Sequence, residues 1–150
     1  MKARRIESTR TLFLQASLVL LFISATACQQ HAEKITDSKS AANETAAIGA
    51  LRSIASAQSL YAVTHNGEYG TFEQLVSGGN LDARFKGEQP TIGGYVLKMK
   101  ASGQTYSVNA DPQQAVAAGS TGSRHFYLDS TDNSVHVNPQ QPASASDPTL

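Results

Sequence analysis

Four histidines are the residues best suited to metal binding or acid–base chemistry, and their positions argue against both roles. His31 lies in a polar stretch near the N-terminus, and His65 lies at the end of a predicted helix. His125 and His136 fall on the outer, solvated face of a predicted hairpin, where polar pairs across the two strands explain them. A zinc site needs three or four converging ligands, and no ligands here have that spacing. We therefore predict no metal site.

The serines, a glycine-rich segment and an acidic loop also lack the partners that catalysis or ion binding requires. Gly119–Ser123 looks like a phosphate loop, but it has no lysine and leads into a predicted strand rather than a helix. No serine stands in a Gly-x-Ser-x-Gly motif. The loop Asp129–Asn133 offers two carboxylates and one amide, whereas calcium takes six to eight oxygens. Turn hydrogen bonds explain these side chains instead. We predict no catalytic residue, no cofactor and no enzymatic activity.

Cys28 is the one residue whose surroundings predict a covalent modification. It is the only cysteine among the 150 residues, so it cannot form a disulfide within one chain. It directly follows the small residues Ala25–Ala27, at the end of an apolar run that begins at Leu12. That run is shorter than the roughly 20 residues that cross a membrane. Basic residues precede it, as in a secretory signal segment, at Lys2, Arg4, Arg5 and Arg10.

These features together resemble the lipobox of bacterial lipoproteins. The resemblance implies that residues 1–27 are a signal peptide and that Cys28 carries acyl chains such as palmitate and becomes the mature N-terminus. More than one acyl chain anchors a protein stably in membrane lipid. Gln29, which follows the cysteine, resembles lipoproteins sorted to the outer membrane. We therefore expect a lipid-anchored protein of the bacterial cell envelope, in the outer membrane and facing the periplasm or the surface.

The charge of the chain after the signal segment argues against nucleic acid as a partner. The signal segment holds four of the twelve basic residues and one of the twelve acidic residues, which leaves 8 basic and 11 acidic residues, a net charge of −3. Binding to phosphates needs a concentrated basic surface, and no cluster of Lys and Arg occurs after the signal segment. We expect membrane lipid and proteins of the cell envelope as partners, and no nucleic acid.

Composition divides the remainder into three parts. Residues 28–42, the lipidated cysteine and a polar stretch, read as a flexible tether. Residues 139–150 consist mostly of Pro, Gln, Ala, Ser and Asp, and we expect this tail to be disordered. Residues 43–138 remain as the folded domain.

The first half of this domain predicts two helices. Asn43 is a suitable N-cap for a long amphipathic helix, which Asn66-Gly67 ends. Its apolar stripe contains Ile48, Leu51, Ile54 and Tyr61. Thr71–Gln74 is a capping box that opens a short helix before Gly78-Gly79. Residues 80–92 show no period, and we place Leu81 and Phe85 in the core.

The second half alternates polar and apolar residues and predicts four strands. A two-residue turn at Ser102-Gly103 pairs Met99 with Tyr106. The last two strands are 125–129 and 134–138, where a two-residue loop pairs Leu128 with Val137 and a four-residue loop pairs it with Val135. Under these alternatives His136 lies opposite Asp129 or Tyr127, respectively. The prediction is an α+β domain in which the long N-terminal helix packs on a four-stranded antiparallel sheet.

The order of these parts resembles the type IV pilins and the pseudopilins of type II secretion systems. The resemblance covers residues 43–138 and is carried by Ala50–Ile54, Ala57–Tyr61, Asn66–Thr71, Gln74-Leu75, Gly93–Val108 and Phe126–Asp129. It implies a pilin-like fold and a non-catalytic interaction or structural role, as an accessory to a type II secretion or type IV pilus system.

Filament assembly is not part of this expectation. The chain lacks the pilin processing site, since no glycine precedes Gly49. The alternative function is that of a stand-alone surface or periplasmic lipoprotein that binds a ligand with the same fold.

Overall fold

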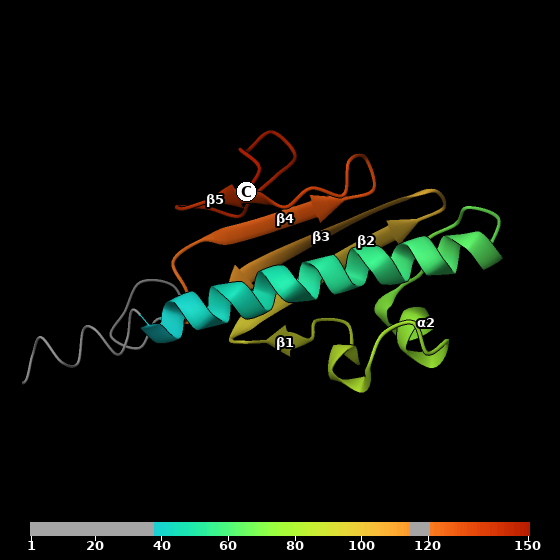
Figure 1. Ribbon diagram of the computed structural model, residues 1–150, viewed down its shortest axis with the longest axis horizontal. Coiled ribbons are helices and arrows are strands. Elements are labelled where there is room, and N and C mark those ends of the chain that lie inside the picture. The colour runs from blue at the N-terminus through green and yellow to red at the C-terminus, as the bar shows by residue number, and fades with distance from the viewer. Residues whose placement is uncertain (1–37, 115–120) are drawn as a thin grey trace, which may run out of the picture. The chain divides into compact units, whose positions relative to one another are not determined.

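A long helix lies across one face of an antiparallel sheet in the computed structural model, which describes residues 38–114 and 121–150 (Figure 1). The helix covers residues 38–64 and precedes every strand. The other elements are α2 (Phe72–Ser77), the 3₁₀ helix η1 (Ala83–Phe85), β1 (Thr91–Ile92), β2 (Tyr95–Ser102), β3 (Thr105–Pro112), β4 (His125–Asp129) and β5 (His136–Asn138).

The predicted four-stranded sheet is wrong, because the sheet has five strands in the order β1-β2-β3-β4-β5, all antiparallel. The missed strand is β1, whose two residues are too few to show an alternating pattern. β1 pairs Thr91 with Val96 and Ile92 with Tyr95. Pro90 precedes it and has no backbone N–H to donate, which limits the strand to this length.

The long helix begins earlier than predicted. Residues 38–42 are helical, so Asn43 is not the N-cap and the last part of the predicted tether belongs to the helix. Alanines at 41 and 42 favour helix. The Asn43 side chain instead donates a hydrogen bond to the carbonyl oxygen of Thr121, 2.7 Å away. At the other end Asn66 and Gly67 adopt positive φ angles and end the helix, as predicted.

The core lies between the long helix and the sheet. Leu51, Ile54 and Tyr61 of the predicted stripe are buried, whereas Ile48 is only half-buried at its margin. Small residues on the same helix face, such as Ala47, let the helix approach the strands closely. The sheet contributes Tyr95, Leu97, Val108, Ala110, Phe126 and Leu128, and the connection between α2 and β1 contributes Leu81 and Phe85, as predicted.

The turn between β2 and β3 differs from the prediction by one residue. It consists of Gly103 and Gln104, so Met99 lies opposite Val108 and not opposite Tyr106. Gly103 has φ +57°, and glycine suits the first central position of a two-residue hairpin turn. The register shifts by two residues, which leaves the same side chains on the same face of the sheet.

The register of β4 and β5 follows the four-residue loop, because Tyr127 pairs with His136. The capping box of α2 is also as predicted: Thr71 Oγ1 accepts from the Gln74 N–H at 3.3 Å, and Gln74 Oε1 accepts from the Thr71 N–H at 2.8 Å.

The C-terminal tail, expected to be disordered, runs back along β5. The Val137 N–H donates to the Pro148 carbonyl and the Leu150 N–H donates to the Val135 carbonyl, both at 2.9 Å. His136 and Thr149 form an antiparallel bridge between these bonds. The composition of the tail offers few apolar side chains, but the unpaired backbone of an edge strand holds it regardless of composition.

Candidate functional site

The residue predicted to carry lipid lies outside the described residues, as does His31. The acylation of Cys28 therefore stays a prediction. Among residues 38–114 and 121–150, no helix is long and apolar enough to cross a membrane.

His65 and His125 each have a local partner. The ring of His65 stacks on the ring of Tyr61, with centroids 3.6 Å apart, and its Nδ1 lies 2.8 Å from the Tyr61 carbonyl oxygen. His125 Nδ1 lies 2.8 Å from a carboxylate oxygen of Asp111, on the neighbouring strand β3. The sequence predicted a polar pair for His125 across the hairpin of β4 and β5, whereas the observed partner lies on β3.

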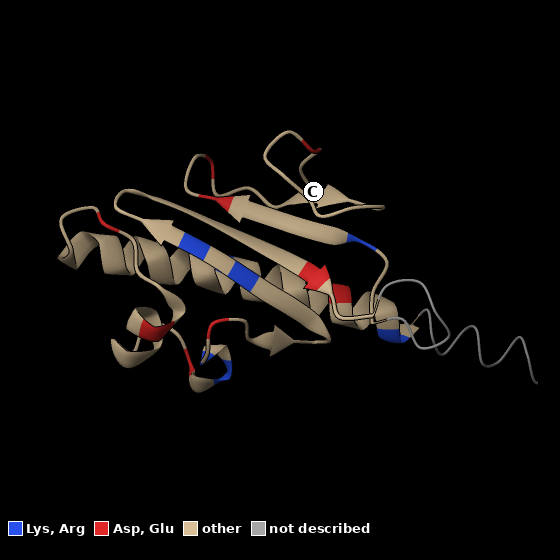
Figure 2. Cartoon of the chain, turned by 180° about the vertical axis from the view of Figure 1, so that it is seen from behind, with Lys and Arg blue, Asp and Glu red and all other residues tan. Residues whose placement is uncertain are grey.

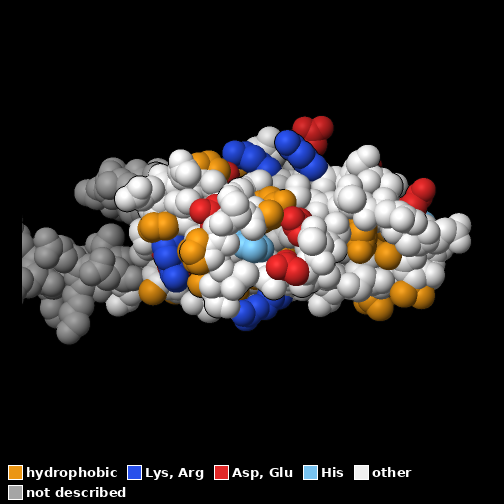
Figure 3. All heavy atoms as spheres, turned by 90° about the horizontal axis from the view of Figure 1, so that it is seen from above, with side chains coloured by type: hydrophobic (Ala, Val, Ile, Leu, Met, Phe, Trp, Pro, Cys, Tyr) orange, Lys and Arg blue, Asp and Glu red, His pale blue; other side chains and the backbone are white. Residues whose placement is uncertain are grey.

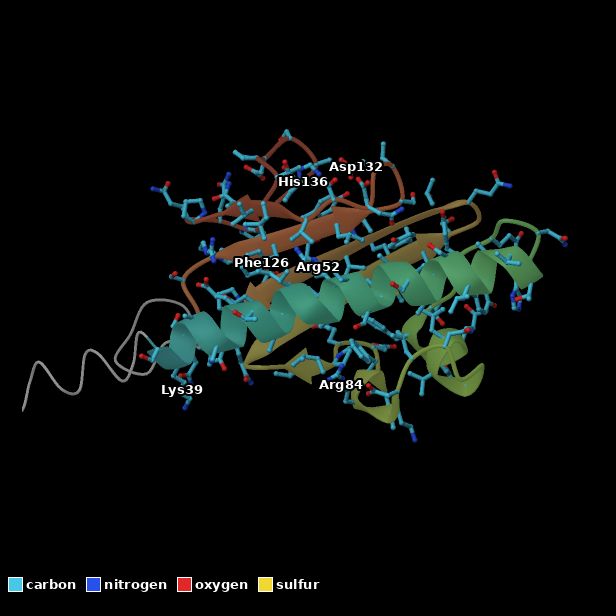
Figure 4. All side chains as sticks on the ribbon, viewed as in Figure 1. Lys39, Arg52, Arg84, Phe126, Asp132 and His136 are labelled. Carbon is cyan, nitrogen blue, oxygen red and sulfur yellow. The ribbon has the colours of Figure 1, made fainter. Side chains whose placement is uncertain are left out.

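His136 does not lie on a solvated face, as the sequence suggested, because the C-terminal tail covers it. Its Nδ1 donates to the Asp147 carbonyl oxygen at 2.7 Å, and its Nε2 lies 3.6 Å from Asp132 (Figure 4). The ring also packs edge-on against Tyr127. Within the described part of the chain, no three His, Cys, Asp or Glu side chains are placed to hold a metal ion.

The acidic loop after β4 uses its carboxylates in turns. Asp129 Oδ1 accepts from the Thr131 N–H and Asp132 Oδ1 accepts from the Ser134 N–H, each at 2.8 Å. Burial alone would raise the pKa of Asp129, but the hydrogen bonds from Thr131 and Tyr127 outweigh burial and leave this pKa below its ordinary value. These are the turn hydrogen bonds that the sequence suggested.

An ion pair with a buried carboxylate, which the sequence did not reveal, joins the long helix to the start of β4. The Glu44 side chain is 8% exposed and lies 2.7 Å from Arg124 Nη2. It also accepts from Arg124 Nε at 2.8 Å and from the Ser123 N–H at 3.0 Å. Burial alone would raise the pKa of Glu44, but these hydrogen bonds lower it below the ordinary value. The partners lie 80 positions apart, and no local pattern marks them.

A groove of about 1070 Å³ lies between α2, η1 and β2. Phe72 and Val76 of α2 form one wall, and Lys98–Ala101 of β2 form the other. β1 pairs only with Tyr95 and Val96 at the start of β2 (Figure 1). The later residues Lys98–Ala101 of β2 line the groove. Sequence reasoning missed the groove because it depends on the length of β1.

On its side away from β3, the backbone of β2 lacks a paired strand along this groove. The Leu97 N–H donates to the Pro90 carbonyl at 2.9 Å, which is the last bond toward β1. At the far end the Tyr69 N–H donates to the Gly103 carbonyl at 2.9 Å. Alternate residues of a strand direct their backbone groups to opposite sides. Those of Met99 and Ala101 therefore point away from β3 and into the groove. We call Leu97–Ala101 the open edge.

Charges of both signs surround the open edge. Lys98 and Lys100 lie on β2, where Figure 2 marks them in blue, and Lys98 Nζ lies 3.4 Å from Asp111. Glu73 and Glu88 line the opposite wall of the groove. The face of the domain above β5 also mixes both signs (Figure 3).

No known relative of this chain was found. Protein-family models, curated proteins and solved structures give no match to this chain. The described histidines and Glu44 contact partners within the fold, and the groove offers main-chain hydrogen-bonding groups beside Phe72 and Val76.

Proposed function

We propose that the protein is a membrane-anchored, non-catalytic lipoprotein of the bacterial cell envelope. The acylated Cys28 holds it in membrane lipid, and the folded domain acts by binding a protein partner. The observation that carries the proposal is the position of this lone cysteine directly after a signal-like apolar run, ten positions before the helical residue Ser38.

The engagement of the polar side chains supports a non-catalytic role. His65, His125 and His136 each contact a partner that belongs to the fold, and Glu44 is paired with Arg124. A catalytic site needs such groups to converge on a space where a substrate can sit. The open edge offers unsatisfied main-chain groups instead, and these suit a protein partner.

An accessory role in a type II secretion or type IV pilus system is part of the proposal. It rests on the motif resemblance around Ala50–Tyr61 and Asn66–Thr71, where the long helix ends and the chain turns toward α2. These motifs lie before the sheet, so the correction from four strands to five does not change them.

The lipid anchor is tested by Cys28→Ser, with Gln30→Ser as the matched control. Cells that express either variant are grown with radiolabelled palmitate and then separated into membrane and soluble fractions. We expect Gln30→Ser to be labelled and retained in membranes, because it leaves the cysteine and the small residues before it unchanged. Cys28→Ser should carry no label. A labelled Cys28→Ser protein would refute the lipoprotein proposal.

A further inference from the structure

We propose that the open edge, Leu97–Ala101, binds an extended segment of a partner protein as an added strand, and that this segment alternates apolar and acidic side chains. This inference rests on the proposed function as an interaction domain, and it names the surface and the chemistry of the partner. In strand addition, main-chain hydrogen bonds supply affinity and alternate side chains supply specificity.

The main chain defines where the added strand would pair. The bond from Leu97 to Pro90 closes one end of the open edge, and the bond from Tyr69 to Gly103 closes the other. Between them the N–H and C=O groups of Met99 and Ala101 have no backbone partner within the described residues. Five strand residues span about 17 Å, which matches a strand of ordinary length. A partner segment of about six residues fits this space.

The two faces of β2 determine which side chains the partner needs. Met99 and Ala101 point toward the long helix, since they share the face of the buried Leu97, and both pack against the core. A neighbouring strand places its own side chains on the same two faces. On the helix side these side chains would meet the wall formed by Phe72 and Val76 and must be apolar.

On the opposite face the partner's side chains would lie beside Lys98 and Lys100. Lys98 is held by Asp111, whereas Lys100 has no ion-pair partner among the described residues. Opposite charges across two strands attract, so acidic side chains belong on this face. Glu73 and Glu88 line the inner wall and would repel acids that point inward. The lysines on the outer face and the glutamates on the inner wall therefore favour the same partner, with acidic side chains outward and apolar side chains inward.

Edge lysines also have a simpler use, because charge on an edge strand keeps two sheets from pairing. If the lysines only prevent pairing, no strand binds at the open edge.

The probe is the synthetic hexapeptide Glu-Val-Glu-Val-Glu-Val with blocked ends, added to the full-length chain in detergent micelles. A peptide of this size is expected to bind with a Kd on the order of 0.1–1 mM, which amide chemical shifts report.

The expected result is slower amide exchange at Met99 and Ala101, with no change at Lys98 and Lys100, whose N–H groups already pair with β3. Lys100→Glu should weaken binding about fivefold or more, and it should favour a Lys-Val peptide instead. The matched control is Lys39→Glu, an exposed lysine on the long helix, which should leave the affinity unchanged. A hexapeptide with N-methylated amides should bind less tightly than the unmodified one.

Three results would overturn the strand proposal: no binding by the wild-type chain, equal effects of Lys100→Glu and Lys39→Glu, or undiminished binding of the N-methylated peptide. Either lysine variant is checked for unchanged amide shifts in the core before peptide is added. Palmitate labelling of the same protein tests the anchor separately. A labelled protein that ignores the peptide therefore refutes the added strand and leaves the lipoprotein proposal standing.

Discussion

Replacing Glu44 by glutamine should lower the free energy of unfolding by about 2–3 kcal/mol. The carboxylate is 8% exposed and accepts hydrogen bonds from Ser123 and Arg124. Glutamine keeps the shape but loses the charge and turns an N–H group toward these donors. Removing one partner of a fully buried pair costs about 3–5 kcal/mol. The Arg124 side chain is 40% exposed, so water can solvate its charge once the carboxylate is gone. The expected loss is therefore about 2–3 kcal/mol rather than 3–5 kcal/mol.

Urea denaturation followed by circular dichroism measures this loss. With a slope of about 1–3 kcal/mol per molar urea, the midpoint should fall by about 0.7–3 M. Glu68→Gln is the matched control, because Glu68 is exposed and surface changes of this kind cost less than about 0.5 kcal/mol. Equal midpoints for the two variants would mean that the pair contributes nothing to stability.

The same comparison has a defined pH dependence. The pKa of Glu44 in the folded protein lies below its ordinary value, so the folded state favours the ionised form. Its contribution to stability is complete above the pKa of an unfolded Glu, about 4.3, and is lost as the pH falls through the lower pKa of the folded state. The difference between wild type and Glu44→Gln should therefore be constant near neutral pH and shrink in acid. A difference that grew in acid would refute this assignment of the charge.

Two further pairs of variants test close packing in the domain, each by thermal or urea denaturation. Leu51→Ala removes a fully buried side chain and should cost about 2–5 kcal/mol, whereas Ser53→Ala should be near neutral; equal losses would mean that the wrong helix face was assigned to the core. Gly122→Ala would place a methyl group against the buried Tyr95 ring and should cost about 1–3 kcal/mol. Gly49→Ala, with open space around it, should stabilise by about 0.5–1 kcal/mol; a stabilised Gly122→Ala would show that Tyr95 moves freely.

Local signals of the sequence predicted the elements that carry a period or a cap. Alternation placed Tyr95 and Leu97 on the buried face of β2, and the capping box at Thr71 marked the start of α2. The turn was displaced by one residue because Ser102-Gly103 and Gly103-Gln104 both satisfy the alternation. Only the close geometry of the turn, with positive φ at Gly103, distinguishes them.

Features held by main-chain bonds or by distant partners were not predictable from composition or period. β1 consists of two residues, and the C-terminal tail is fixed by bonds from Val137 and Leu150. The pair of Glu44 and Arg124 depends on the whole fold to bring it together. The groove follows from β1, since a longer first strand would cover Met99 and Ala101.

The tail along β5 also limits how many molecules can join by sheet pairing. Val135–Val137 are already bonded to residues 148–150, so that rim of the sheet is satisfied within the chain. On β2, Met99 and Ala101 keep main-chain groups with no backbone partner among the described residues. Each molecule offers one such stretch on β2. Two copies that met through β2 would form a closed pair, and a partner strand seated there would give one-to-one stoichiometry with no growing fibre.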